Sequence, residues 1–174
     1  MVRSPASVAV DSWLQLPMFI DVEASGMGRG SYPIEVGFVD ESGRGTCSLI
    51  RPFADWTHWD EKAEQLHGIT RTTLEHHGRP AVQVAMGLNR RLAGRTLYSD
   101  GWGMDQSWIG LLFERCELVP MFRLESLRTL LSEPQASAWG AAKDQVIAET
   151  GTQRHRASND ARVLQQTYLR VVGG

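Results

Sequence analysis

The order of the expected secondary structure constrains the fold of this chain more than any other feature. Three strand-like segments come first, at residues 18–23, 33–40 and 46–51. The first, MFIDVE, is mostly apolar, as in a strand buried within a sheet, and the second alternates polar and apolar residues. Turn-forming residues at 41–43 separate the second segment from the third, which predicts an antiparallel meander.

Helical patterns dominate the rest of the chain. Two further strands are expected, at residues 96–99 and near Met121. The expected helices lie at residues 59–67, 70–76, 80–92, 105–113, 125–131, 138–149 and 158–172. Strands at the start, followed by helices that alternate with strands, predict an α/β domain around a mixed sheet.

The length of 174 residues fits one domain. We interpret residues 1–16 as an N-terminal extension without the features of a secretion signal, and 17–174 as the domain. No apolar run approaches the ~18 residues of a membrane-spanning helix, so no membrane contact is expected. Cys47 and Cys116 lack a metal-binding spacing, which favours two reduced thiols in a cytoplasmic protein.

The charge balance limits how the chain could hold nucleic acid. It has 18 Lys and Arg against 20 Asp and Glu, a net charge of −2. Proteins that grip long duplex DNA by its phosphates usually carry a large positive surplus, so any such contact here should be local, short or metal-assisted. Arg71, Arg79, Arg90, Arg91 and Arg95 are scattered along the sequence. We interpret them as parts of solvated faces, of which a few could meet phosphates.

Two carboxylates lie on the first predicted strand. Asp21 and Glu23 are two residues apart and therefore point to the same face. Within a buried strand they repel each other and lose hydration, which a divalent cation would offset. A solvated strand end is the alternative interpretation.

A third acid, Asp105, lies at the start of a predicted helix. Considered alone, it is better explained as a first-turn aspartate that the helix dipole favours. The nearby Asp100 competes with it for any metal role, although a turn explains Asp100 better.

The segment before the last helix combines a histidine with a fourth acid. His155 lies on the loop and Asp160 in the first helical turn. A loop histidine beside a helix-borne carboxylate suits a general base next to a metal, because histidine titrates near neutral pH. The alternative is a surface histidine, with Ser158 or Asn159 capping the helix.

In combination these elements resemble the DEDDh family of 3′–5′ exonucleases, which includes polymerase proofreading subunits, oligoribonuclease and ribonuclease T. The matching segments are FIDVEASG at 19–26, SDGWGMDQSW at 99–108 and HRASNDARVL at 155–164, with SYPIEVGFV at 31–39 and LHGIT at 66–70 as secondary matches. The resemblance extends over about residues 17–169.

This resemblance implies a ribonuclease H-like fold with a mixed five-stranded sheet flanked by helices. It also implies two Mg²⁺ or Mn²⁺ ions held by Asp21, Glu23, Asp105 and Asp160, with His155 as general base. Two metals ~3.5–4 Å apart can activate water, neutralise the phosphate and stabilise the leaving oxygen. The expected reaction is hydrolysis of the terminal phosphodiester of single-stranded RNA or DNA, with release of nucleoside 5′-monophosphates.

The contacts to the substrate are expected to differ from those of the family. Ala24 stands where many relatives carry Thr, and Asp100 and Gly101 replace a common His-Asn pair. By resemblance, Ala24 and the LHGIT residues His67 and Ile69 are candidates to approach the terminal nucleotide, although Ile69 also suits the core. Trp102, on a glycine-flanked loop, is a candidate to stack on a base, whereas the spacing of Trp108 suits the core.

Two other functions fit the same residues. One is a non-catalytic nucleic-acid-binding module, which the presence of all five catalytic residue types disfavours. The other is a phosphodiesterase for very short oligonucleotides, which the short chain and near-neutral charge make plausible. Many relatives dimerise, so a homodimer is an open expectation.

Overall fold

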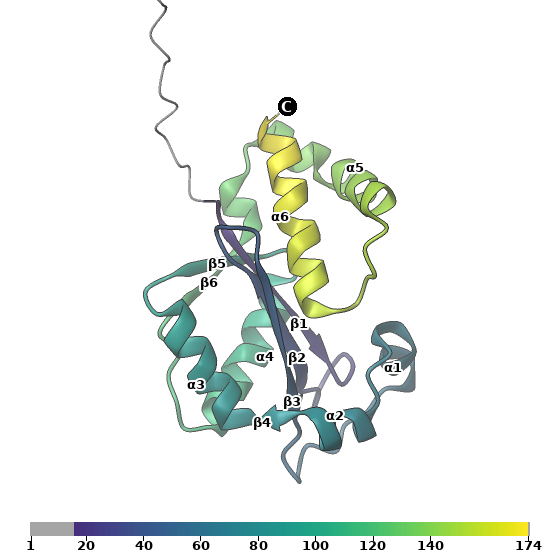
Figure 1. Cartoon of the computed structure of the whole chain (residues 1–174), viewed down its shortest axis with the longest axis vertical. Coiled ribbons are helices and arrows are strands. Elements are labelled where there is room, and N and C mark those ends of the chain that lie inside the picture. The colour runs from purple at the N-terminus through teal and green to yellow at the C-terminus, as the bar shows by residue number, and fades with distance from the viewer. Residues whose placement is uncertain (1–15, 174) are drawn as a thin grey trace, which may run out of the picture.

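The computed structural model describes residues 16–173 (Figure 1). The predicted extension at 1–16 lies almost entirely outside this range, and the boundary at residue 17 stays a prediction. Within the described part of the chain, no helix has both the length and the apolar character to cross a bilayer.

A six-stranded mixed sheet, in the order β4-β3-β2-β1-β5-β6, forms the centre of the fold. Its strands are β1 (Met18–Ala24), β2 (Pro33–Val39), β3 (Gly45–Arg51), β4 (Arg79–Pro80), β5 (Thr96–Ser99) and β6 (Arg123–Ser126). The first three strands form the predicted antiparallel meander. β5 runs parallel to β1, β6 runs parallel to β5, and β4 runs parallel to β3.

Helices cover both faces of the sheet (Figure 1). They are α1 (Glu61–His67), α2 (Arg71–His77), α3 (Ala81–Leu92), α4 (Trp102–Arg115), the 3₁₀ helix η1 (Leu127–Leu130), α5 (Glu133–Thr150) and α6 (Ala157–Gly173). The main core joins one face of the sheet to α3 and α4, for example through Ile20, Leu88 and Leu112. A smaller core joins Phe19, on the other face, to Leu164 of α6.

The predicted α/β class, with a mixed sheet flanked by helices, is confirmed, with six strands rather than five. The additional strand, β4, has only two residues, and it pairs with the end of β3 through Ile50 and Arg51. A strand this short carries no periodicity that a sequence pattern could show.

The helix predicted at residues 125–131 is confirmed only in part, as the short 3₁₀ helix η1. The chain there forms the end of β6 and then η1, because residues 123–126 alternate in burial and pair in register with β5. The next helix, α5, begins at Glu133 rather than at residue 138. Ser132 and Gln135 have the sequence spacing of a capping box, which marks a helix start. In the structure the backbone N–H of Ser132 donates to the side chain of Gln135 at 2.9 Å.

Candidate active site

The two acids of β1 project from the sheet face that α6 covers. Side chains alternate along a strand, so Asp21 and Glu23 share their face with Phe19, which packs against α6. The intervening Ile20 and Val22 face the main core on the opposite side. The buried strand thus fixes the direction of both carboxylates.

A glycine on the neighbouring strand brings the start of α6 up to these acids. Gly37 is the cross-strand partner of Asp21. A Cβ at this position would lie 2.5 Å from the carbonyl carbon of Ala157, closer than real side chains approach. Only glycine therefore allows the first turn of α6 to rest on β2 beside Asp21.

Asp105 reaches the same region from α4. It lies in the first turn of that helix, is only 3% exposed, and accepts a hydrogen bond from the hydroxyl of Ser99 at the end of β5. Burial raises the pKa of Asp105 to about 7, against the opposing effect of the Ser99 hydrogen bond. The helix begins three residues before Asp105, so this aspartate is not its N-cap.

Asp160 is held by the loop that precedes it. The backbone N–H of His155 donates to its Oδ2 at 2.8 Å, and Nε of Arg154 donates to its Oδ1. His155 adopts a left-handed conformation, with φ of 61°, which is uncommon outside glycine. The loop is therefore folded back so that the histidine lies beside the carboxylate of the following helix.

These groups converge at one place. Ligand atoms of Glu23, His155 and Asp160 all lie within 4.8 Å of one another. The pKa of Asp21 is raised well above its usual value by burial and by the charges of Asp105, Glu23 and Asp160, in addition to Asp100. Burial and neighbouring carboxylates, first among them Asp160, also raise the pKa of Glu23 to about 7.

This donor set fits divalent cations. Carboxylate oxygens are the ligands that Mg²⁺ and Mn²⁺ prefer. Without a cation, the raised pKa values of Asp21, Glu23 and Asp105 show that ionising these groups together is costly. Of the four predicted ligands, Glu23 and Asp160 belong to this group with His155. Asp21 and Asp105 are close enough for charge–charge repulsion to contribute to the raised pKa values of Asp21 and Glu23.

Three charged residues around the site were not among the predicted site residues. Glu35 on β2 is fully buried and accepts from Arg156 Nη2 at 2.7 Å and from the backbone N–H of Ala157 at 2.9 Å. Arg154 holds Asp160, as described above. The sequence offered one signal for Glu35, a lone acid in the otherwise apolar PIEVGFV strand; the arginines gave none, because their partners depend on how α6 meets the sheet.

The four predicted nucleic-acid contacts occupy different surroundings. The side chains of Ala24 and Ile69 are buried in the main core, so each could approach a ligand mainly through its backbone. Trp102 is 40% exposed at the start of α4, and its indole donates to the carbonyl of Leu124 at 3.0 Å. Trp108 is buried in the core, as the helical spacing predicted.

His67 is buried, and Glu35 and His155 are close enough for their charges to act on its pKa. Its Nδ1 accepts a hydrogen bond from the N–H of Ile69 at 3.0 Å, and its Nε2 has no hydrogen-bond partner among residues 16–173. Burial lowers the pKa of His67, and the charges of Glu64, Glu35 and His155 also act on it. These surroundings place His67 at the margin of the site, where its predicted role stays a prediction.

Asp100, near the predicted metal ligands, has a charged partner of its own. It forms an ion pair with Lys143 of α5, which accounts for its charge. This contact favours a structural role, although the Asp100 charge still contributes to the raised pKa values of Asp21 and Asp105.

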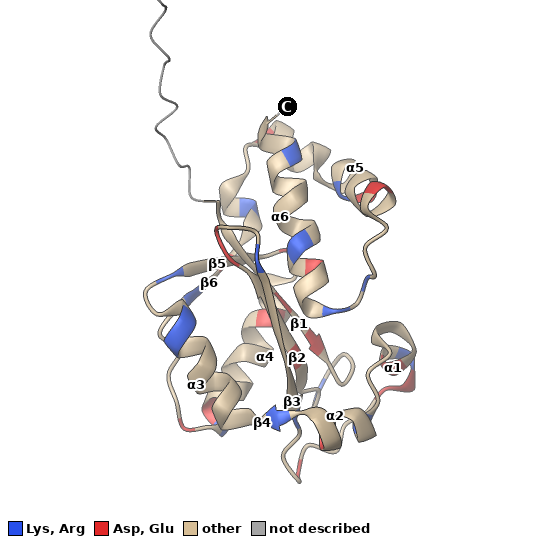
Figure 2. Ribbon diagram, in the orientation of Figure 1, with Lys and Arg blue, Asp and Glu red and all other residues tan. Residues whose placement is uncertain are grey.

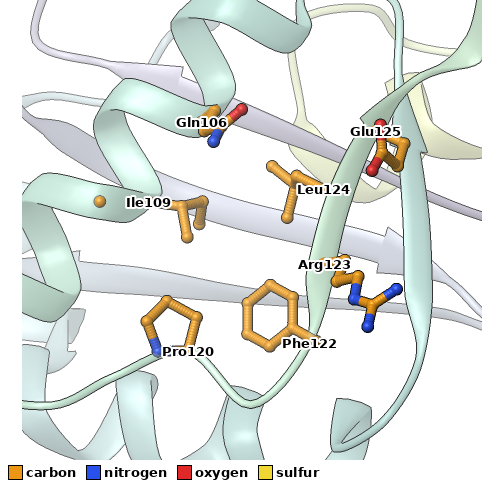
Figure 3. A pocket seen from close by; sticks show the side chains of 8 residues that line it. Gln106, Ile109, Pro120, Phe122, Arg123, Leu124 and Glu125 are labelled. Atoms are coloured by element: carbon orange, nitrogen blue, oxygen red, sulfur yellow. The ribbon is translucent and has the colours of Figure 1, made fainter.

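A cavity of about 430 Å³ lies between α4 and β6, away from these acids (Figure 3). Figure 3 shows Ile109, Phe122 and Leu124 among the side chains that line it. It contains none of the predicted ligands, and one carboxylate, that of Glu125, lines it. The chemistry of the clustered carboxylates, rather than the volume of this cavity, therefore identifies the candidate site.

Comparison with solved structures places this arrangement in a known fold. The chain superimposes on exonuclease I with a TM-score of 0.68 at 13% identity, covering 88% of this chain and 40% of that one. It also matches the zinc-bound complex of E. coli exonuclease I with single-stranded DNA (TM-score 0.62, 13% identity, 91% and 41% covered). A moderately thermophilic exonuclease I from Methylocaldum szegediense gives a TM-score of 0.61 at 12% identity, with 88% and 40% covered.

These likenesses establish the fold, and they concern about two fifths of the length of the exonuclease I chains. No protein-family model and no curated protein sequence matched the chain. The chain is therefore an α/β domain with the fold seen in the exonuclease I structures, and it carries an acidic cluster suited to divalent cations.

Proposed function

We propose that the chain is a metal-dependent 3′–5′ exonuclease that hydrolyses the terminal phosphodiester of single-stranded nucleic acid and releases nucleoside 5′-monophosphates. One observation carries this proposal: Glu23 and Asp160 lie beside His155, and the charges of Asp21 and Asp105 act on the same group of acids, with raised pKa values at three of the four. The exonuclease I neighbours, some of them solved with single-stranded oligonucleotides, support the same assignment.

In this proposal Asp21, Glu23, Asp105 and Asp160 hold two Mg²⁺ or Mn²⁺ ions. When bound, the ions would neutralise the phosphate, lower the pKa of water and stabilise the leaving oxygen. Asp21 and Glu23 are set by β1, and Asp105 by α4, so these carboxylates need little rearrangement. Arg154 must release Asp160 before both of its oxygens can serve as ligands.

His155 is the proposed general base. Its backbone N–H is anchored to Asp160, so the imidazole stays next to the ligand cluster. It takes the proton from the attacking water as the phosphorus–oxygen bond forms, and the bond to the departing 3′ oxygen breaks. The half-buried position of the ring allows exchange of that proton with solvent after each turnover.

Two attributes accompany the proposal. Cys47 and Cys116 are both free thiols, which is compatible with the predicted cytoplasmic location. A homodimer stays a prediction that oligomeric-state measurements would have to address.

The test is hydrolysis of 5′-labelled oligonucleotides of graded length with Mg²⁺, Mn²⁺ or Ca²⁺. We expect a ladder shortened from the 3′ end with Mg²⁺ or Mn²⁺ and little turnover with Ca²⁺, whose looser coordination positions the water poorly. His155→Ala should lower the rate by ~10²–10⁴-fold, the range for losing a general base. His76→Ala, on the exposed side of α2, is the matched control.

Three results would redirect the assignment. A rate for His155→Ala within twofold of wild type would place the base elsewhere. Activity confined to dinucleotides would instead favour a phosphodiesterase for very short fragments. Binding of oligonucleotides with no hydrolysis under any metal condition would favour a non-catalytic module.

A further inference from the structure

Positive charge is segregated in one segment of this weakly acidic chain. From residue 76 to residue 99 there is no Asp or Glu, and the segment carries Arg79, Arg90, Arg91 and Arg95. The whole chain, by contrast, has a net charge of −2. Figure 2 shows blue residues on β4 and on α3, both of which belong to this segment. A charge separation of this kind marks a surface for an anionic partner.

The fold gathers three of these arginines around one cavity. Arg79, Arg90 and Arg91 line a space of about 120 Å³ between β3 and α3, and no Asp or Glu lines it. Thr46 and Ser48 of β3 add hydroxyl groups to the same lining. Nη1 of Arg91 donates to Oγ1 of Thr46 at 3.2 Å, which holds this guanidinium at the mouth. We call this surface the arginine groove.

The charges of the groove are not neutralised by the protein. Among residues 16–173, none of Arg79, Arg90 and Arg91 forms an ion pair, whereas the adjacent Arg44 pairs with Asp40 at 3.5 Å and Arg95 with Glu41 at 2.5 Å. Guanidinium groups favour bidentate contacts with phosphate oxygens. The combination of three unpaired guanidinium groups with hydroxyl donors is suited to phosphate groups.

The groove and the acids lie on opposite faces of the sheet, and the free edge of β3 separates them. Thr46 pairs with Phe38, which faces the main core on the α3 side. β4 pairs only with Ile50 and Arg51, so the preceding part of β3 has no strand beyond it. On the α6 side of that edge, Arg162 lies so close to Gly45 that a Cβ there would be 3.0 Å from its Nη2. Exposed cations therefore lie on both sides of the edge.

We propose that the arginine groove binds backbone phosphates of a single-stranded nucleic acid whose 3′ end occupies the candidate active site. The inference rests on the proposed function for the identity of the strand, and it adds a second contact that only longer substrates reach. A strand that leaves the acids would pass Arg162 and the free edge of β3 before it enters the groove. Short fragments would bind at the acids alone.

The test is fluorescence anisotropy with labelled oligothymidylates of 4 and 16 nucleotides in Ca²⁺, which can neutralise the acids and is expected to support little turnover. The groove variant is Arg90→Gln with Arg91→Gln. The control is Arg128→Gln with Arg170→Gln, which removes the same charge from arginines already paired with Glu133 and Glu149. Thermal melting of both variants confirms that they are folded.

We expect the groove variant to bind the 16-mer at least ~10-fold more weakly at low salt. Its slope of log affinity against log salt should fall by about 1.4, since each lost single-strand phosphate contact contributes ~0.7. Binding of the 4-mer should change equally little in the groove variant and the control. Equal 16-mer affinities for groove variant and control would overturn the proposal.

The two proposals fail separately in these experiments. Wild-type protein that degrades oligonucleotides while the groove variant keeps its 16-mer affinity would reject the groove alone. Groove-dependent binding in a protein that never hydrolyses the strand would reject the proposed exonuclease and leave the groove as a nucleic-acid-binding surface.

Discussion

Two glutamates that face each other across adjacent strands have opposite surroundings. Glu23 of β1 and Glu35 of β2 are partners in the sheet register. Glu35 is completely buried, and Arg156 and the N–H of Ala157 satisfy its oxygens. Glu23 belongs to the acidic cluster. Burial and neighbouring carboxylates raise its pKa to about 7, and the positive charge of Arg154 opposes this shift.

This difference separates Glu35, which is neutralised within the fold, from Glu23, which is available to bind a cation. A buried carboxylate without a cation is costly, and a neutralised one is tolerated. The fold supplies an arginine for Glu35 but leaves Asp21, Glu23 and Asp105 to repel one another. The negative charges of these three buried acids have too little positive charge near them, and a divalent cation would supply it.

The contrast between Glu23 and Glu35 depends on the position of α6 on the sheet. Gly37→Ala should therefore have the largest effect, because it moves α6. The new methyl group would displace the first turn of α6, which carries both the donor to Glu35 and the proposed ligand Asp160. We expect nuclease activity to fall by ~10²-fold or more, the cost of a displacement of about 1 Å at a catalytic centre. Overpacking should also destabilise the fold by about 1–3 kcal/mol.

Gly140→Ala is the control for this change, because a Cβ at that position on α5 meets nothing within 4 Å. Rate assays and urea unfolding measure the two effects. Wild-type activity in Gly37→Ala would show that the close approach of α6 does not position the site.

Substitution of the two glutamates should have opposite effects on stability in EDTA. Glu35→Gln leaves Arg156 without its charged partner and should lower the free energy of unfolding by about 2 kcal/mol. Glu23→Gln removes one of the repelling charges and should leave stability unchanged or higher at pH 8. Chemical denaturation measures both, and equal losses of stability would remove the distinction between the two residues.

The pH dependence of stability should sharpen the same contrast. Glu23 titrates near 4.5 when unfolded and about 7 when folded, and Asp105 moves from 3.8 to about 7. Between these values the folded chain binds more protons than the unfolded chain, so its stability falls as pH rises from about 4 to above 7. The difference between wild type and Glu23→Gln, measured in EDTA at pH 5 and pH 8, isolates this contribution. A difference that does not grow with pH would contradict it.

The smallest expected effect concerns Arg154. Its guanidinium pairs with Asp160 and so competes with a metal for that oxygen. A partly exposed ion pair contributes about 1 kcal/mol, so Arg154→Gln should tighten Mn²⁺ binding by about fivefold. Calorimetry with Arg128→Gln as control measures this, and weaker binding in Arg154→Gln would assign the arginine a supporting role instead.

The sequence predicted those features that depend on local patterns. The buried pattern of residues 18–23 identified β1, and its i, i+2 spacing placed Asp21 and Glu23 on one face. The segment from His155 to Asp160 was recognised because its residues are close in the sequence and lie at a helix start.

Features that depend on distant contacts were not predictable in this way. Arg156 and Glu35 are 121 residues apart, and no periodicity links them. The arginines of the groove were interpreted as scattered because their grouping requires β4 to bring Arg79 next to α3. The helix predicted at residues 125–131 began too early for the same reason, since pairing with β5 makes residues 125 and 126 part of β6.

The most direct measurement is calorimetric titration of the apo protein with Mn²⁺, compared with Asp21→Asn. Asp21 lies among the other acids, and its pKa is raised by burial and by the charges of three proposed fellow ligands. The account predicts that wild type binds two ions and that the variant, still folded, loses tight binding of at least one. An isotherm for Asp21→Asn that matches wild type, or no binding by wild type at millimolar Mn²⁺, would contradict the account.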